Sequence, residues 1–287
     1  MKDAFIHTAR KAFHQALITD GIISVDVDDV ASNADKDNPD SKAISAHILK
    51  AMGRPLIQKK LSGQSLGSKF EKACLVFVET TFPKLGHLRP GTWLVTHPRG
   101  KFKNGIAVTE QYAHLADLTE ACLQLPQLAA MIGQDYLISP DIMILRDPEE
   151  DDVINSKGIM VDDSVARLAS LRKRNGGKAI FHASISCKFT MRSDRAQNSR
   201  SEALNLIRNR KGRVPHVAVV TAEPLPSRLA SLALGTGDLD FVYHIALPEL
   251  RAAVDAIGSA DSKECLNIMV DGKRLRDISD LPLDLAV

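Results

Sequence analysis

The segment KAIFHASISCKF (178–189) limits the possible folds most strongly, because its side chains alternate in character. A period of two is typical of a β-strand, whose successive side chains point to opposite faces. One face would be apolar, and the other would carry Ser184, Ser186 and Lys188. We therefore expect a strand with one face in the core and a polar face outside it.

Apolar runs predict three further strands, with helical patterns between them. The strands are expected at residues 142–145, 216–223 and 241–247. Helices are expected at residues 1–21, 68–82, 110–131, 199–212 and 248–258. Alternating helices and strands favour an α/β fold with a mixed sheet core flanked by helices.

Nothing in the sequence divides the chain into separate domains. It has no repeat, no low-complexity tract and no Pro/Gly/Ser-rich linker, and the polar stretches at 32–42 and 146–158 predict loops. A length of 287 residues allows one large α/β domain. We expect a single domain over residues 1–287.

The composition excludes several protein classes. No apolar run approaches the ~20 residues of a membrane-spanning helix, so no membrane partner is expected. The four cysteines lie far apart without a CxxC pair, which is typical of reduced thiols and indicates a cytoplasmic protein. The basic part of the chain has few aromatic residues, so stacking platforms for single-stranded nucleic acid are missing.

The charge is unevenly distributed along the chain. The net charge is +2, but residues 167–228 contain fourteen Lys and Arg against three acids. This segment therefore carries +11, and the remainder carries −9. A local excess of this size predicts phosphate binding, although a solvated helix face is the alternative.

Two acids are placed in the sequence to meet Lys188. Asp141 opens the strand 142–145 directly after Pro140, and Glu202 is expected at the start of the helix that follows residue 188. Two carboxylates beside a Lys would bind a hard cation such as Mg²⁺, and the Lys could contact a phosphate or an attacking water. The alternatives are a turn residue at Asp141 and a solvated Lys188.

These residues carry a resemblance to a known nuclease core. Pro140-Asp141 followed by Ser186-Cys187-Lys188 is similar to the PD-(D/E)xK motif, with Ser186 in place of the usual acid. One branch of type II restriction endonucleases has this replacement and takes the missing carboxylate from the next helix, where Glu202 lies. Further blocks resemble the NgoMIV family in the same order, among them LSGQSLGSKFE, NRKGRVPH, VVTAEPLPSR and DGKRLRDISDLPLDLAV.

The resemblance implies a restriction-endonuclease-like fold and an active site. Asp141 and Glu202 would hold two Mg²⁺ ions, and Lys188 would orient the attacking water. Ser186 and the Cys187 carbonyl would lie at the edge of the metal site. The reaction would be in-line displacement at phosphorus, leaving a 5′-phosphate and a 3′-hydroxyl.

A further acid belongs to the implied active site. Glu71 lies on the helix expected at 68–82 and matches an acidic member of the family's site. The alternative is an ordinary exposed helix acid.

The stretch RSDR (192–195) has the chemistry to read G·C pairs. Arg192 and Arg195 can each donate to O6 and N7 of a guanine, and Asp194 can accept from N4 of a cytosine. The resemblance implies that this stretch reads a central CCGG. The alternative is that Ser193 and its neighbours cap the following helix.

Three separated residues match family positions at the outer pairs of GCCGGC. They are Gln64, Arg228 and Asp35, of which Asp35 could also be a turn residue. The resemblance implies cleavage after the first G, which leaves four-base 5′ overhangs. Arg200, Arg208, Arg210, Lys211 and Arg213 are expected to contact phosphates or to be surface charges.

A palindromic site in double-stranded DNA calls for a two-fold symmetric protein. The resemblance implies a homodimer on each site, assembled into a homotetramer. Two other functions compete with this one. One is a DNA-binding module without cleavage, and the other is a phosphate-handling α/β enzyme, although GQSLGSK (63–69) lacks the GK[ST] ending of a phosphate loop.

Overall fold

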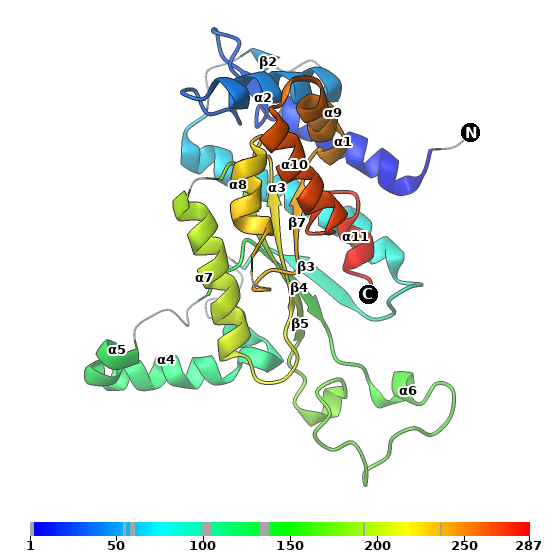
Figure 1. Ribbon diagram of the computed structural model, residues 1–287. Helices are drawn as coiled ribbons and strands as arrows, with labels where there is room; N and C mark the ends of the chain where they lie inside the picture. The colour runs from blue at the N-terminus through cyan, green and yellow to red at the C-terminus, as the bar shows by residue number, and fades with distance from the viewer. Residues whose placement is uncertain are drawn as a thin grey trace. The chain divides into compact units, whose positions relative to one another are not determined.

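The computed structural model (Figure 1) is a mixed α/β protein built on a six-stranded sheet. It describes residues 3–53, 56–57, 61–98, 105–132, 138–191, 193–235 and 237–287. The strand order is β3-β4-β5-β6-β7-β8, in which β3 and β4 are antiparallel whereas β6, β7 and β8 run parallel. The expected α/β class with a mixed sheet is confirmed. No helix within these ranges is long and apolar enough to cross a membrane.

The strand β5 (Ile180–Lys188) lies in the interior of the sheet and is buried along most of its length. The side chains of residues 181–187 are all buried, and Ser184 and Ser186 are only 5% and 9% exposed. The prediction of a polar face outside the core is therefore wrong. An interior strand of a sheet with helices on its faces is covered on both sides, whatever its alternation.

The chain divides into two compact units. Unit 1 comprises residues 1–85, 185–201 and 217–287, and unit 2 comprises residues 86–184 and 202–216. Both β5 and α7 (Ser193–Asn209) contribute residues to each unit. The expectation of a single domain stays a prediction.

Unit 1 contains most of the helices. Its elements besides parts of β5 and α7 are α1 (Phe5–Thr19), β1 (Ser24–Val25), α2 (Pro39–Met52), β2 (Leu56–Ile57), α3 (Gly63–Thr81), η1 (Phe82–Leu85), β6 (His216–Thr221), α8 (Pro226–Ala233), β7 (Phe241–His244), α9 (Leu247–Ile257), α10 (Ala260–Asp271), β8 (Leu275–Asp277) and α11 (Leu281–Asp284). Helix α8 packs on α10, and α2 packs on α9 (Figure 1).

Unit 2 contains the remaining elements. They are β3 (Trp93–Thr96), η2 (Gly105–Val108), η3 (Glu110–Tyr112), α4 (His114–Gln124), α5 (Pro126–Ile132), β4 (Ile142–Arg146), α6 (Asp151–Ile154) and η4 (Lys173–Asn175). Side chains of η3 fasten this unit together. The Gln111 amide donates to the Phe181 carbonyl and accepts from the Phe181 N–H, and the Tyr112 hydroxyl donates to the Leu206 carbonyl on α7.

The helix expected at 110–131 is broken into three pieces. Residues 110–112 form the 3₁₀ turn η3, and α4 ends at Gln124. Pro126 begins α5, because a proline has no N–H for the preceding helix and fits the first turn of a new one. The expected loops are also partly helical, since α2 begins at Pro39 and α6 lies within 146–158.

An aromatic core in unit 1 holds α3 against its neighbours. Phe13 of α1 and Phe77 of α3 have ring centroids 5.3 Å apart. Phe70 is fully buried, and its ring meets Phe189 edge-on with centroids 5.4 Å apart. Phe189 directly follows Lys188, so this contact places α3 beside the end of β5.

Substitution of Phe70 tests the aromatic core. Phe70→Ala should lower the free energy of unfolding by about 3–5 kcal/mol, because it removes a buried ring and leaves a cavity. Urea denaturation measures this loss. Val76→Ala on the same helix is the control, because Val76 is 47% exposed, and its effect should stay within about 0.5 kcal/mol. Equal effects of the two substitutions would contradict the assignment of Phe70 to the core.

Candidate functional site

Four of the residues expected in the active site belong to unit 1. Lys188 is the last residue of β5 and is half-buried, whereas Ser186 and Cys187 before it are buried. Glu71 lies on α3 and is 9% exposed, which excludes the alternative of an ordinary exposed helix acid. The contact between Phe70 and Phe189 brings the backbone beside Glu71 to the strand end that carries Lys188.

The other two residues belong to unit 2. Asp141 directly precedes β4 and is 6% exposed, so its side chain is buried at the start of this strand. Glu202 is half-buried on α7. It was expected at the start of a helix, but α7 already begins at Ser193 and Glu202 lies within it.

The donor chemistry of these residues suits a hard divalent cation. The described part of the chain contains no group of three or more His, Cys, Asp and Glu side chains that could hold a metal. Mg²⁺ does not require one, since it binds through one or two carboxylates and completes its shell with water and substrate phosphate oxygens. A buried Asp141 has the oxygens and the placement for such a ligand.

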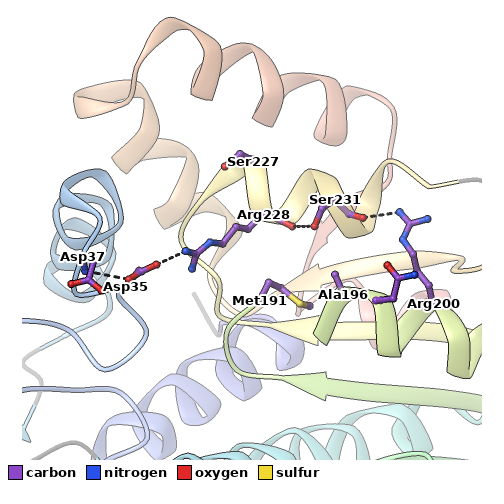
Figure 2. A pocket seen from close by; sticks show the side chains of 9 residues that line it. Asp35, Asp37, Met191, Ala196, Arg200, Ser227, Arg228 and Ser231 are labelled. Atoms are coloured by element: carbon purple, nitrogen blue, oxygen red, sulfur yellow. Dashed lines mark hydrogen bonds and ion pairs between the residues drawn. The ribbon is translucent and has the colours of Figure 1, made fainter. Parts of the chain in front are cut away.

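A pocket of about 710 Å³ in unit 1 is lined by two of the residues expected to read bases (Figure 2). Asp35 and Arg228 line it, together with Met191, the residue before Arg192. Gln64 does not line this pocket and is exposed on the first turn of α3. The pocket therefore brings together two of the three residues expected at the outer base pairs.

The RSDR stretch is described only in part. Arg192 lies outside the described residues. Residues 193–195 form the first turn of α7, so the stretch leads into a helix as the capping alternative also required. The side chains of Asp194 and Arg195 lie outside the description.

Asp35 and Arg228 form an ion pair with each other (Figure 2). The Arg228 guanidinium donates to the Asp35 carboxylate across the pocket. The N–H of Asp37 donates to the same carboxylate over 3.2 Å. Asp35 therefore has a local turn contact, as the alternative reading held, and in addition a partner from α8.

A third charged side chain lies beneath this pair. Glu223 follows β6 and is 1% exposed, with one carboxylate oxygen 3.9 Å from Nη1 of Arg228. Its carboxylate accepts the N–H groups of Met191 at 2.7 Å and Leu225 at 3.2 Å. Burial raises the pKa of Glu223 to about 7, although the two N–H donors and Arg228 favour the charged form.

Arg200, which was expected to contact a phosphate or to be a surface charge, has partners within the protein. Its guanidinium donates to the carbonyls of Ser231 at 2.8 Å and Leu232 at 3.3 Å, at the C-terminal end of α8 (Figure 2). It also lies 3.5 Å from the Asp238 carboxylate. A Cβ on Gly235 would collide with this guanidinium, so the glycine leaves room for it. Arg200 therefore joins α7 to α8.

Part of the basic excess is neutralised inside unit 2. Arg172 is 2% exposed and donates to both oxygens of Asp151 at 2.6 Å. These hydrogen bonds lower the pKa of Asp151 to about 2. Lys173 pairs with Glu150, and Arg174 pairs with Asp151 and Asp163. Residues 172–174 thus balance the acidic segment 146–163 and are engaged within the protein.

Sequence reasoning missed Glu223 and the structural role of Arg200. Glu223 entered it only as one of three acids in the basic segment. A usable signal was present, because a carboxylate that directly follows a buried strand must find hydrogen-bond donors. Nothing in the sequence indicated that Arg200 faces the end of α8, since the two segments are about thirty residues apart.

The raised pKa of Glu223 predicts a pH-dependent stability. In the folded protein this carboxyl binds its proton more tightly than in the unfolded chain. Its contribution to the free energy of unfolding is therefore fully present below about pH 4.5 and is lost as pH rises through about 7. Glu223→Gln cannot titrate. Its free energy of unfolding relative to the natural protein should therefore increase between pH 5 and pH 8, by roughly 3 kcal/mol at most.

Urea denaturation at a series of pH values measures this difference. Asp277→Asn is the matched control, because Asp277 is also a buried carboxylate that accepts backbone N–H groups. Burial would raise the pKa of Asp277, but the hydrogen bonds from Arg10 and Ser279 hold it below its usual value. Its contribution is lost only in acid, so the Asp277→Asn difference should stay constant between pH 5 and pH 8. A constant difference for Glu223→Gln would contradict the raised pKa.

Comparisons with known proteins agree with the resemblance in the sequence. A family model described as NgoMIV restriction enzyme matches residues 13–287. The type II restriction enzyme NgoMIV of Neisseria gonorrhoeae is 49% identical over 278 residues, which cover 97% of each chain. A solved complex of restriction endonuclease PspGI with substrate DNA aligns at 15% identity and a TM-score of 0.33, covering 98% of this chain and 91% of that chain.

Both the family model and the relative match over nearly the whole length of the chain. Restriction endonucleases generally use a divalent metal ion, which agrees with the donor chemistry described above. The chain therefore belongs to the NgoMIV restriction enzyme family, and it is a type II restriction endonuclease that cleaves DNA at a specific sequence.

Proposed function

We propose that this enzyme cleaves double-stranded DNA at GCCGGC. The cut falls after the first G and leaves four-base 5′ overhangs with 5′-phosphates. The observation that carries this proposal is the pocket of unit 1, because Asp35 and Arg228 line it beside the residue that precedes Arg192. Residues of the types that recognise G·C pairs are thus near one another although they are far apart in sequence.

The hydrolysis is assigned to the three residues of the nuclease motif. Asp141 and Glu202 hold two Mg²⁺ ions, which supply charge neutralisation at the scissile phosphate and acidify water. Lys188 orients the attacking water and places its ammonium group against the phosphate. The placement of Lys188 at the end of β5 and the burial of Asp141 support these roles.

Three further groups complete the proposed active site. Glu71 supplies a nearby carboxylate, and Ser186 and the carbonyl of Cys187 border the metal ions. Glu71 and Ser186 are each 9% exposed and belong to the same unit as Lys188, which supports their place there. The side chain of Cys187 faces the core and takes no part in the chemistry.

The base readers divide into an inner and an outer set. Arg192 and Arg195 donate to the guanines of the central CCGG, and Asp194 accepts from a cytosine. Arg228, Asp35 and Gln64 read or flank the outer pairs. The ion pair between Arg228 and Asp35 supports a shared location for these two residues of the second set.

A palindromic site requires one active centre for each strand. We propose a homodimer on each site and a homotetramer that holds two sites. The enzyme acts in the cytoplasm, where its thiols stay reduced. No disulfide joins its four cysteines, all of which lie among the described residues.

Plasmid cleavage tests the chemistry. The purified enzyme with Mg²⁺ should linearise a plasmid that carries GCCGGC and leave a matched plasmid without the site intact. Lys188→Ala should slow cleavage at least about a hundredfold, because the attacking water loses its orienting cation. Lys11→Ala is the control, because Lys11 is 64% exposed and pairs with Asp3. Full activity of Lys188→Ala would remove Lys188 from the mechanism.

Substitution of Arg228 tests the outer base pair. Duplexes that keep CCGG but change the flanking pair should be cut poorly by the natural enzyme. Arg228→Ala should lose about 1–3 kcal/mol of this discrimination, which is the usual worth of a bidentate base contact. The ratio of kcat/KM for the two duplexes measures it. An unchanged ratio would show that Arg228 reads no base at this position.

A further inference from the structure

Residues 222 and 223, directly after β6 in unit 1, join three segments that are far apart in the sequence. The Asn33 amide donates to the Ala222 carbonyl over 2.9 Å. The Ala222 N–H donates to the Phe189 carbonyl over 3.0 Å. The Glu223 carboxylate accepts the N–H of Met191 over 2.7 Å. These short contacts fix the three backbones relative to one another.

Each of these segments leads directly into a residue that we propose to read bases. Asn33 lies two residues before Asp35, and Met191 directly precedes Arg192. The other oxygen of Glu223 accepts the N–H of Leu225, the residue before α8 and its Arg228. A residue shortly before each proposed base reader is thus held at one common anchor, residues 222 and 223.

Glu223 is the charged member of this anchor. A buried carboxylate loses its hydration, so it is retained only where donors replace the lost water. Here the donors are two backbone N–H groups, and Nη1 of Arg228 lies 3.9 Å from the oxygen that serves Leu225. Both oxygens accept from main chain, and at 1% exposure the side chain is out of reach of DNA.

The other charged and titratable groups around Glu223 come from three elements. Arg228 of α8 favours its charged form, and Asp35 of the loop before α2 opposes it. His244 at the end of β7 lies beside the Glu223 backbone, and burial lowers the pKa of this imidazole to about 4. His244 is therefore neutral at pH 7 and adds no competing charge.

The same segments are held at a second point. Arg200 of α7 donates to the last carbonyls of α8, and Glu223 accepts the N–H groups of Met191 and Leu225, which precede the first turns of α7 and α8. Helices α7 and α8 are thus connected at both ends of α8. Their relative position is set within the protein, before any DNA is bound.

We propose that Glu223 is a positioning residue for base recognition, which holds the segments that carry Arg192 and Arg228 in register with one another. This inference rests on the reading roles proposed above for those two residues. Glu223 itself touches no DNA. Hydrogen bonds to base edges fail with a displacement of about 1 Å, whereas contacts to phosphates tolerate it. Loss of Glu223 should therefore reduce specific binding far more than non-specific binding.

The test is a comparison of affinities for two duplexes of equal length, one with GCCGGC and one with the same bases scrambled. Binding is measured by fluorescence anisotropy in a Lys188→Ala background, so that cleavage does not interfere. Glu223→Gln keeps the size of the side chain but replaces one of its two acceptor oxygens by an NH₂ group, which cannot accept the N–H of Met191 or Leu225. It should weaken cognate binding at least tenfold and scrambled binding less than twofold.

Asp277→Asn is the matched control, because it removes a buried carboxylate that anchors backbone N–H groups away from the three segments. It should leave the ratio of the two affinities unchanged. Circular dichroism verifies folding, and Glu223→Asp, which keeps the charge with a shorter reach, replaces the Gln variant if that variant is unfolded. An unchanged ratio in a folded Glu223 variant would overturn the proposal, and so would an equal loss in Asp277→Asn.

Arg192→Ala separates this inference from the proposed function on which it rests. If Arg192→Ala lowers the affinity ratio and a folded Glu223 variant does not, the positioning role alone is wrong. If Arg192→Ala leaves the ratio unchanged, the reading role of the RSDR stretch is wrong, and the positioning role falls with it. A loss of the ratio in both variants, with the control unchanged, supports both.

Discussion

The carboxylate of Glu223 is the interaction on which the arrangement of the pocket in unit 1 depends. It satisfies two backbone N–H groups that no regular secondary structure serves, and they belong to segments more than thirty residues apart. A hydrogen bond to a charged acceptor contributes about 1.5–3 kcal/mol, about twice a neutral one. The burial of the charge more than offsets this gain, because the pKa of Glu223 is raised to about 7 in spite of its donors. The main effect of the carboxylate is therefore on geometry, because it fixes the directions of the two backbone segments that donate to it.

Much of the fold could be predicted from the sequence, namely those elements in which the spacing of apolar residues reflects the buried faces. The stripe of α3 and the apolar runs of β4, β6 and β7 lie where their patterns indicate, since each pattern reflects one buried face or two. Pattern failed where tertiary context outweighs it. The alternation in β5 resembles that of a half-exposed strand, yet Ser184 and Ser186 are covered because β5 lies inside the sheet.

The candidate site was predictable in its residue types but not in its pairings. The motif residues were identified by spacing and resemblance, and charge counting found the basic segment. Counting could not reveal that Arg172 is paired with Asp151, or that Arg200 binds the end of α8. The fold determines which long charged side chains meet, and no periodic pattern in the sequence indicates such a pair. The number of Lys and Arg residues in a basic segment is therefore an upper limit to the number of positive side chains that are available to contact DNA.

The ion pair between Arg228 and Asp35 means that this arginine has an acceptor before any DNA arrives. A base that engages Arg228 must outcompete a carboxylate at close range, and a guanine with two well-placed acceptors does so better than any other base. On unrelated DNA the arginine can remain with Asp35 and stay neutralised. If Arg228 reads a base as proposed, the Asp35 carboxylate competes with that base for the guanidinium, and a base that offers fewer acceptors should bind less well.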